Sequence, residues 1–507
     1  MDDEGVRFPL IDGRRSTQQT SRDIFAGAAR VCDADLASAI SAERSWRTAY
    51  PTHLRNLTAR AAVSPATGAA IARAGLERVH DAFEFGVGGT TRSMGDAMAS
   101  PSGPALRTRT VAGEGTAAGL TVPYRSEVLQ GQGLLDAAAE WRRRGVVEPA
   151  VVAALSRLVD HPEWFDLDGM WFAVLGAGAE MAPTERLLRW GADVVAIDVP
   201  SPGIWRHLEE LATAGSGRLH VPVDDDGGPL GIDLVTGAPR IGAWLAGFDH
   251  PLVLGNYAYA DAATFALVSV AADAVIAGLR SQRDDHAVVC LATPTDAFAV
   301  SADVVAETRR RAGTVSAAAG RGLRRVTANR LMVPSYREMV RTDDGREVGI
   351  ADSLVLQQGP NYALAKRIQR WRAIVANAGG AAGAVHVAPP TRTRSVLKNR
   401  VLAAAYAGAS LFGVETFEPA TSRALMAALL IHDLRVHRAT ITRDAQPAEA
   451  VGAAAAPVNG RRHGPIAEHD MTAAAVHGGL WRVPWETRTA LPLAVLRGAP
   501  ALLRSGA

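Results

Sequence analysis

A tyrosine and a lysine, Tyr362 and Lys366, stand four residues apart in a segment whose apolar spacing predicts a helix over 363–377. Residues at i and i+4 share one face of a helix, so the ammonium can lower the pKa of the phenol and make it a usable acid or base. The chain contains seven tyrosines but only two lysines, the second being Lys398. At that composition about 0.03 such pairs are expected by chance, and we therefore expect an acid–base unit here.

A second group of residues has the spacing of a dinucleotide site. Gly176 and Gly178 follow the apolar run at 171–175, which is typical of a strand buried on both faces, and Asp198 ends the next predicted strand. In such a site the first glycine permits a tight turn, the second lets the backbone approach pyrophosphate, and the acid binds the adenosine ribose. An acid at this position favours NAD, because it would repel the 2′-phosphate of NADP.

The elements that must position these residues alternate between strand and helix. Further buried strands are predicted at 218–223, 251–257, 286–292 and 383–389, and helical runs such as 262–280 separate them. This alternation predicts an α/β fold with a doubly wound, Rossmann-like parallel sheet.

The flanking regions do not show this alternation of strands and helices. Residues 1–165 are predicted to be mainly helical, with a long Gly-, Ser-, Thr- and Pro-rich loop over 86–119. The Rossmann-like domain is expected over 166–436, with an insertion at about 297–355, and 437–507 is expected to be a loose tail.

Taken together, the strand, the glycine turn, the acid, the Tyr-x-x-x-Lys pair and the later loop VHVAPPTRT resemble the short-chain dehydrogenase/reductase family over residues 171–400. The resemblance implies an NAD(P)-dependent oxidoreductase that transfers hydride between nicotinamide and a carbonyl or alcohol carbon. It implies that Tyr362 is the catalytic acid/base and that Lys366 binds the nicotinamide ribose. By the same resemblance, Pro389 and Thr391 border the nicotinamide, and Asn256 occupies a strand-ending position of the cofactor site.

The chain also departs from the family pattern. Its glycine turn has the shorter Gly-x-Gly form, with Met181 at the position of the third glycine and Glu180 beside the expected phosphate. The position of the family's serine is Gly349 here. The nearest hydroxyls that could polarise a carbonyl are Ser353 and Thr293, and we interpret the chain as a divergent member.

Composition limits the partners. Fifty-four basic and 52 acidic residues give a net charge of +2, so a nucleic-acid partner is not expected, and a small-molecule substrate is. Two cysteines, Cys32 and Cys290, favour a reducing compartment, and the N-terminus lacks a secretory pattern, so we expect a cytoplasmic protein. The longest apolar run, 262–279, contains Asp273 and is expected to be a buried helix, not a membrane span. The family resemblance also implies possible homo-oligomers.

Two other functional classes stay open. A methyltransferase that uses S-adenosylmethionine also pairs a glycine turn with an acid at the end of the next strand, and a catalytically silent nucleotide-binding protein would need no acid–base pair. His463 and His469 could suggest a metal site, but without a third ligand nearby we expect solvated histidines and no metal.

Overall fold

A seven-stranded sheet forms the centre of the protein, which we describe from a computed structural model over residues 4–224, 228, 230–314, 318–444, 467 and 469–505. From edge to edge the strands are β15 (Gly383–Val387), β11 (Ala287–Ala292), β10 (Leu252–Asn256), β7 (Trp171–Leu175), β8 (Asp193–Ile197), β9 (Arg218–Asp224) and β4 (Leu106–Ala112). Six of them run parallel, and β4 pairs antiparallel with β9 at one edge. The predicted α/β class and all six predicted strands are confirmed.

The parallel strands are apolar on both sides because both sides face a core. In β7, Phe172 and Val174 join one hydrophobic cluster while Ala173 and Leu175 join the other. This alternation follows from the period of two in a strand, and it requires helices on both faces of the sheet.

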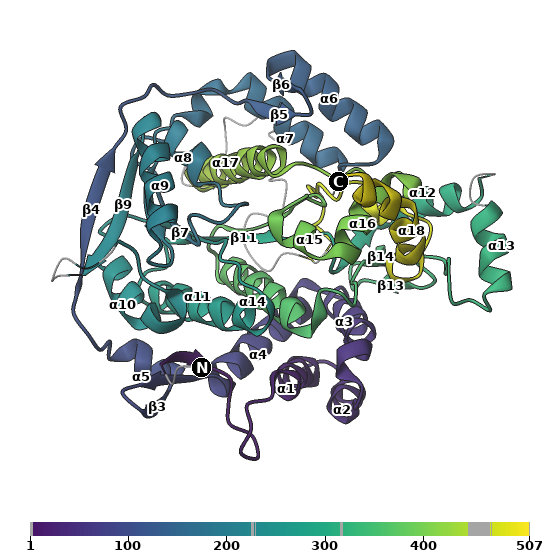
Figure 1. Cartoon of the computed structure of the whole chain (residues 1–507), viewed down its shortest axis with the longest axis horizontal. Helices are drawn as coiled ribbons and strands as arrows, with labels where there is room; N and C mark the ends of the chain where they lie inside the picture. The colour runs from purple at the N-terminus through teal and green to yellow at the C-terminus, as the bar shows by residue number, and fades with distance from the viewer. Residues whose placement is uncertain are drawn as a thin grey trace.

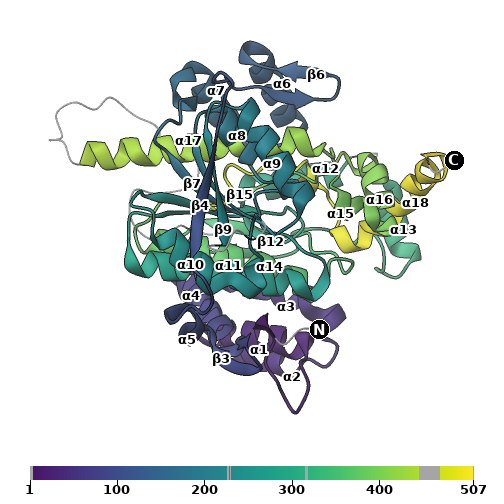
Figure 2. The ribbon, with the colours of Figure 1, turned by 60° about the vertical axis from the view of Figure 1, so that its left-hand side comes forward.

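Figures 1 and 2 show those two helical layers. One face is covered by α10 (Leu234–Ala246), α11 (Ala262–Gln282) and α14 (Gly359–Ala378). Outside this layer lie α1 (Thr17–Arg30), α2 (Ala34–Ala42), α3 (Trp46–Ala61), α4 (Pro65–Ala82) and α5 (Met94–Ala99). The other face carries α6 (Gly131–Arg144), α7 (Pro149–Asp160), η1 (Pro162–Phe165), α8 (Thr184–Arg189), α9 (Pro202–Ala214) and α17 (Pro419–Asp444). The N-terminal helices therefore share a core with the sheet.

The direction of winding reverses between β7 and β10. From β7 the chain builds outward through β8 to β9, and it then returns to place β10 on the opposite side of β7. The connections that follow β7 and β10 therefore leave the sheet in opposite directions. Open α/β sheets bind ligands at such a point, outside the carboxyl ends of the two strands.

The prediction of a long loop over 86–119 is wrong, because this segment contains regular structure. It contains β3 (Thr90–Ser93), α5 and the edge strand β4; β1 (Gly5–Arg7), β2 (Glu84–Val87) and β3 form a small separate sheet. The side chains of β4 are mostly exposed, so this strand is held by backbone pairing with β9 and has no apolar run to reveal it.

The predicted insertion forms a small structure of its own beside the sheet. Strands β12 (Ala297–Ser301), β14 (Glu347–Asp352) and β13 (Met339–Arg341) pair antiparallel, with α12 (Ala302–Ala312) and α13 (Ala318–Val326) between β12 and β13. A hairpin of β5 (Val122–Tyr124) and β6 (Glu127–Leu129) lies in the N-terminal region.

The C-terminal region contains more regular structure than the expected loose tail. After β15 come α15 (Arg394–Lys398), α16 (Arg400–Gly408) and η3 (Ala409–Phe412), and helix α17 extends to Asp444. Residues 469–505 include η4 (Leu480–Arg482) and α18 (Thr487–Ser505), and α18 packs on α16. The rest of the predicted tail, 445–466 with 468 and 506–507, lies outside the described residues.

Helix α11 is the one helix in the described part of the chain that is long and apolar enough to cross a membrane. It packs against α10 and α14, and its Asp273 is buried. Arg372 donates two hydrogen bonds to the Asp273 carboxylate (2.7 and 2.8 Å), and His80 lies 2.6 Å from it. The run is thus a core helix, as expected.

Candidate active site

Except for Ser353, the predicted site residues lie near the carboxyl ends of the parallel strands. Gly176 follows β7, Asp198 follows β8, Asn256 ends β10, Thr293 follows β11 and Pro389 follows β15. They lie at the same end of the sheet because the carboxyl ends of parallel strands point the same way. Helix α14, which carries Tyr362 and Lys366, packs directly on β11 and β15.

The glycine turn after β7 needs its glycines for packing. Gly176 has φ of 84°, and a Cβ there would lie 2.5 Å from the Cα of Ala258. A Cβ on Gly178 would lie 2.6 Å from a methyl group of Ile204 in α9. The turn is therefore pressed between the segment after β10 and the start of α9.

Asp198 holds this turn in place. One carboxylate oxygen accepts the N–H of Gly178 at 2.7 Å, and the other accepts the N–H of Val199 at 2.8 Å. Burial raises the pKa of Asp198, and the two backbone hydrogen bonds oppose that rise. A carboxylate has about four acceptor positions, so lone pairs remain for ligand hydroxyls.

The helix after the turn begins later than the sequence indicates. Helix α8 starts at Thr184 and has six residues, so no helix N-terminus follows directly on Gly178. The side chain of Glu180 accepts the backbone N–H of Arg394 at 2.9 Å, and Arg423 donates to the Glu180 carbonyl at 3.0 Å. The Nε of Arg394 also lies 3.8 Å from the Glu180 carboxylate, so one guanidinium stands near the negative charge beside the expected phosphate position.

A cleft of about 470 Å³ opens beside this turn. Its walls include the glycine turn, α9, and residues that follow β15 and begin α17: Gly178, Glu180, His207, Leu211, Arg394 and Arg423. The cleft is therefore open to a ligand that contacts the turn backbone.

The phenol of Tyr362 lies among other hydroxyls and rings. It lies close enough to the side chain of Thr293 to interact with it, and its ring lies 5.4 Å from the Phe265 ring. The phenols of Tyr406 and Tyr259 lie close enough to act on it, so three of the seven tyrosines meet here. Burial raises the pKa of Tyr362, opposite to the expected lowering by Lys366.

Lys366 is turned toward the sheet. Its Nζ donates to the backbone oxygen of Leu291 at 2.9 Å and to Oε1 of Gln369 at 3.0 Å, and it lies 5.6 Å from the centre of the Phe265 ring. Burial lowers the pKa of Lys366 to about 8. These contacts explain why the lysine, although one turn away, is not a cause of the phenol's shift.

The two candidate hydroxyls fall in different places. Thr293 is in contact with Tyr362, and its oxygen lies 2.8 Å from the hydroxyl of Thr295, which accepts a hydrogen bond from Nε2 of Gln358 at 2.6 Å. Ser353 is buried after β14, where it lines a second cavity, and its backbone N–H donates to the Asp296 carbonyl. Sequence reasoning missed Gln358, although it lies four residues before the tyrosine.

The other predicted cofactor residues shape the loops. Asn256 is buried, and its side-chain oxygen accepts the backbone N–H of Ala258 at 3.3 Å. The hydroxyl of Thr391 donates to the Pro389 carbonyl and lies 2.7 Å from the hydroxyl of Ser422 in α17. Thr391 is thus engaged beneath α17, and the loop that it closes borders the strand ends.

The C-terminal segment contacts both loops that carry the site. The indole N–H of Trp481 donates to the carbonyl of Pro294 at 3.2 Å, and the N–H of Val476 donates to the carbonyl of Val387 at 3.0 Å. Thr472 donates to the carbonyl of Ala299 at 2.9 Å. This segment therefore lies between the loop after β11 and the end of β15.

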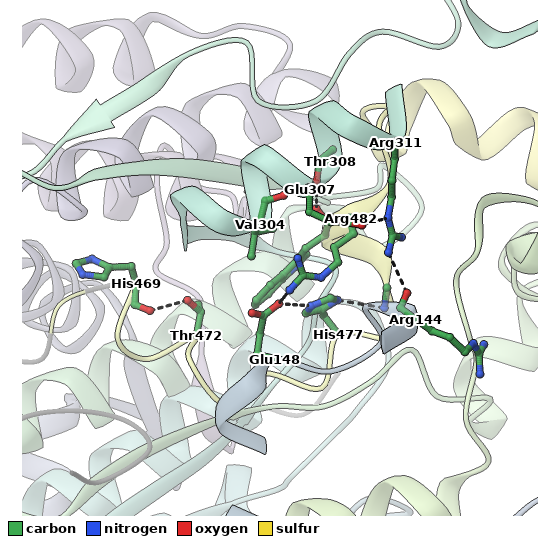
Figure 3. A network of polar contacts seen from close by, with 12 residues as sticks. Arg144, Glu148, Val304, Glu307, Thr308, Arg311, His469, Thr472, His477 and Arg482 are labelled. Carbon is green, nitrogen blue, oxygen red and sulfur yellow. Dashed lines mark hydrogen bonds and ion pairs between the residues drawn. The ribbon is translucent and has the colours of Figure 1, made fainter. Parts of the chain in front are cut away.

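A buried polar network anchors the segment (Figure 3). Glu148, at the start of α7, accepts Nε2–H of His477 at 2.8 Å and the guanidinium of Arg482 at 2.7 Å. The Nδ1 of His477 accepts the N–H of Gly479, which assigns the ring proton to Nε2. Burial lowers the pKa of His477; burial raises that of Glu148, but its two partners lower it further.

In the described part of the chain, no group of three or more His, Cys, Asp or Glu side chains is arranged to hold a metal ion. His469, expected to be solvated, is instead largely buried beside Asp470, and His463 lies outside the described residues. Neither a family model nor a curated protein matches this sequence. The function therefore has to be inferred from the fold and from the residues at the strand ends.

Proposed function

We propose that the protein is an NAD(P)-dependent oxidoreductase of the short-chain dehydrogenase/reductase type, acting on a carbonyl or alcohol of a small molecule. The observation that carries this proposal is the placement of the Tyr362 phenol beside the Thr293 hydroxyl at the strand ends, with Lys366 one helical turn further. The six parallel strands also have the order of the Rossmann dinucleotide-binding fold, with the site at its switch point.

The residues present fit a nicotinamide dinucleotide. The backbone at Gly176 and Gly178 would approach the pyrophosphate, and the remaining lone pairs of Asp198 would accept ribose hydroxyls. The buried side-chain oxygen of Asn361, in the first turn of α14, has no donor among the described residues. A donor of a bound ligand could satisfy this oxygen, as buried polar groups normally are.

The other residues expected to bind the cofactor are Asn256, Lys366, Pro389 and Thr391. Asn256 and Thr391 would act mainly by holding their loops, whereas Lys366 would have to turn its ammonium from the Leu291 carbonyl to a ribose hydroxyl. The dinucleotide, when bound, supplies the hydride. The acid at Asp198 favours NAD over NADP.

Burial raises the pKa of Tyr362, so its phenol is protonated at neutral pH but is a weaker acid than a solvated tyrosine. In the proposed carbonyl reduction the phenol gives its proton to the carbonyl oxygen as the carbon gains hydride, and solvent then reprotonates it. Thr293 would donate a hydrogen bond to the same oxygen and stabilise its developing charge. Ser353 lies in a different cavity and has no part in this step.

The first experiment is a titration of the protein with NADH and NADPH, followed by tryptophan quenching and energy transfer to nicotinamide. Asp198→Asn is expected to weaken NADH binding more than NADPH binding, because it removes the charge that repels a 2′-phosphate. Asp168→Asn, which removes an exposed carboxylate, is the control. Equal weakening of both nucleotides, or none, would contradict the assigned role of Asp198.

Turnover is then tested with a panel of aldehydes and ketones. Tyr362→Phe is expected to lower kcat at least a hundredfold, the usual scale of a general acid, and to keep NADH affinity. Tyr124→Phe, which removes a phenol that donates to Glu415 on the other helical face of the sheet, is the control. Binding without turnover would favour the catalytically silent alternative, and binding of S-adenosylmethionine alone would favour the methyltransferase. A cytoplasmic location and homo-oligomers stay predictions.

A further inference from the structure

We propose that Thr295 and Gln358 are positioning residues that fix the direction of a hydrogen-bond chain, so that Thr293 presents its proton to the substrate oxygen. This inference rests on the proposed oxidoreductase function. The chain runs from Nε2 of Gln358 to the Thr295 hydroxyl (2.6 Å), on to the Thr293 hydroxyl (2.8 Å), and then to the phenol of Tyr362.

The direction follows from the donors available. An amide NH₂ group can only donate, and a hydroxyl has one proton and two acceptor positions. Gln358 fills one acceptor position of Thr295, and we infer that Thr295 donates its own proton to Thr293. The backbone N–H of Thr295 also points at the Thr293 oxygen, at 3.3 Å. Both acceptor positions of Thr293 are then filled, and its one proton is left for the phenol oxygen of Tyr362 or, once substrate is bound, for the reacting oxygen.

The direction matters for chemistry. A hydroxyl that stabilises a developing alkoxide has to donate, because an acceptor lone pair aimed at that oxygen would repel it. Rotating the amide of Gln358 by half a turn would present its oxygen to Thr295. Thr295 would then donate to Gln358, Thr293 would donate to Thr295, and no hydroxyl proton would point toward the substrate.

The chain is tied to the helix that carries the tyrosine. Gln358 immediately precedes α14, and Arg367 of the same helix donates to the buried carboxylate of Asp296 at 2.9 Å. The loop 293–296 is thus joined to α14 at two points. We infer that these two contacts hold Thr293 beside Tyr362.

The decisive variant is Gln358→Glu, because a carboxylate can only accept. We expect kcat for carbonyl reduction to fall at least tenfold above neutral pH, with the KM for NADH and the melting temperature nearly unchanged. As pH falls through the pKa of the new carboxyl group, the protonated form can donate and activity should recover. The charged groups nearby are Lys366, Asp296, Arg367, and Arg47 beside Gly359.

Gln357→Glu is the matched control, since it places the same charge one residue earlier and Gln357 makes no bond to Thr295. It should show no recovery at low pH. A Gln358→Glu protein with unchanged kcat, or with a loss that is equal at every pH, would overturn the directional role. The second outcome would mean that Gln358 is only structural.

A second measurement does not need turnover. The ionisation of the Tyr362 phenol can be isolated by subtracting the absorbance titration of the matching Tyr362→Phe protein. In Gln358→Glu this ionisation should move to higher pH, because Thr293 no longer donates to the phenolate. An unmoved titration overturns the hydrogen-bond chain, whereas a moved titration in a protein that reduces no carbonyl counts only against the proposed reaction.

Discussion

Replacing Asp273 by Asn tests how α14, the helix that carries Tyr362 and Lys366, is held. The Asp273 side chain is 1% exposed and binds Arg372 of α14 and His80 of α4 from the centre of α11. Asp273→Asn keeps the shape and one acceptor oxygen but leaves the Arg372 guanidinium without its counter-charge. Removing one partner of a buried ion pair typically costs about 3 to 5 kcal/mol, and we expect a loss near the lower value because Asn still accepts one bond.

The pH dependence of stability gives a second measure of what Asp273 contributes to the free energy of unfolding. Although burial alone would raise it, Arg372 and His80 lower the pKa of Asp273 to about 2, against about 3.9 in an unfolded chain. A pKa lowered on folding stabilises the folded state above the unfolded value and loses that effect as pH falls through the folded value. The carboxylate therefore contributes about 2 to 3 kcal/mol above pH 4, lost between about pH 4 and pH 2.

The assay is urea denaturation followed by tryptophan fluorescence at neutral pH and at steps down to the acid limit of the folded protein. Asp273→Asn should lower the denaturation midpoint at neutral pH and flatten its fall in acid. The control is Asp81→Asn, which removes an exposed carboxylate 3.8 Å from Arg78 on α4 and should change stability by less than about 0.5 kcal/mol. Equal midpoints for the two variants would refute the assignment of Asp273 as a buried clamp.

Two further predictions concern the glycine turn and the C-terminal segment. Gly178→Ala places a methyl group against Ile204 and should weaken NADH binding at least tenfold, whereas Gly203→Ala, with open space around it, should not; equal affinities in a titration would contradict this. Trp481→Phe removes the indole N–H that binds the loop after β11, and should speed hydrogen exchange in that loop and lower kcat several-fold. Trp485→Phe, in the same segment but packed in a separate cluster, is its control, and identical exchange in the two variants would count against the contact.

The sheet could be predicted because its parallel strands are buried on both faces. Runs such as 171–175 and 287–292 are apolar at every position, so they are visible without knowledge of their neighbours. Strand β4 is the contrasting case. Its residues alternate Thr and Arg and stay exposed, so only the backbone of β9, more than 100 residues later, determines that it is a strand.

The site could be predicted in part. The local spacing of residues was enough to predict Tyr362 and the glycine turn as parts of a site. It indicated two candidate hydroxyls, Thr293 and Ser353, but gave no reason to choose between them. Only the packing of α14 on β11 places Thr293 beside the phenol and Ser353 elsewhere. The orientation of Lys366 could not be predicted either, because it depends on the free carbonyl of Leu291 at the end of β11.

The family resemblance covers residues 171–400, yet the site depends on residues outside that range. The loop after β11 and the strand β12 present the carbonyls of Pro294 and Ala299 to the C-terminal segment, which supplies their donors. That segment is anchored to α7 by the buried contact of His477 with Glu148. A chain reduced to the resembling core would leave these carbonyls without partners and would free the loop that holds the predicted catalytic threonine. The predicted acid–base pair is therefore local in sequence, but the geometry around it depends on segments from both ends of the chain.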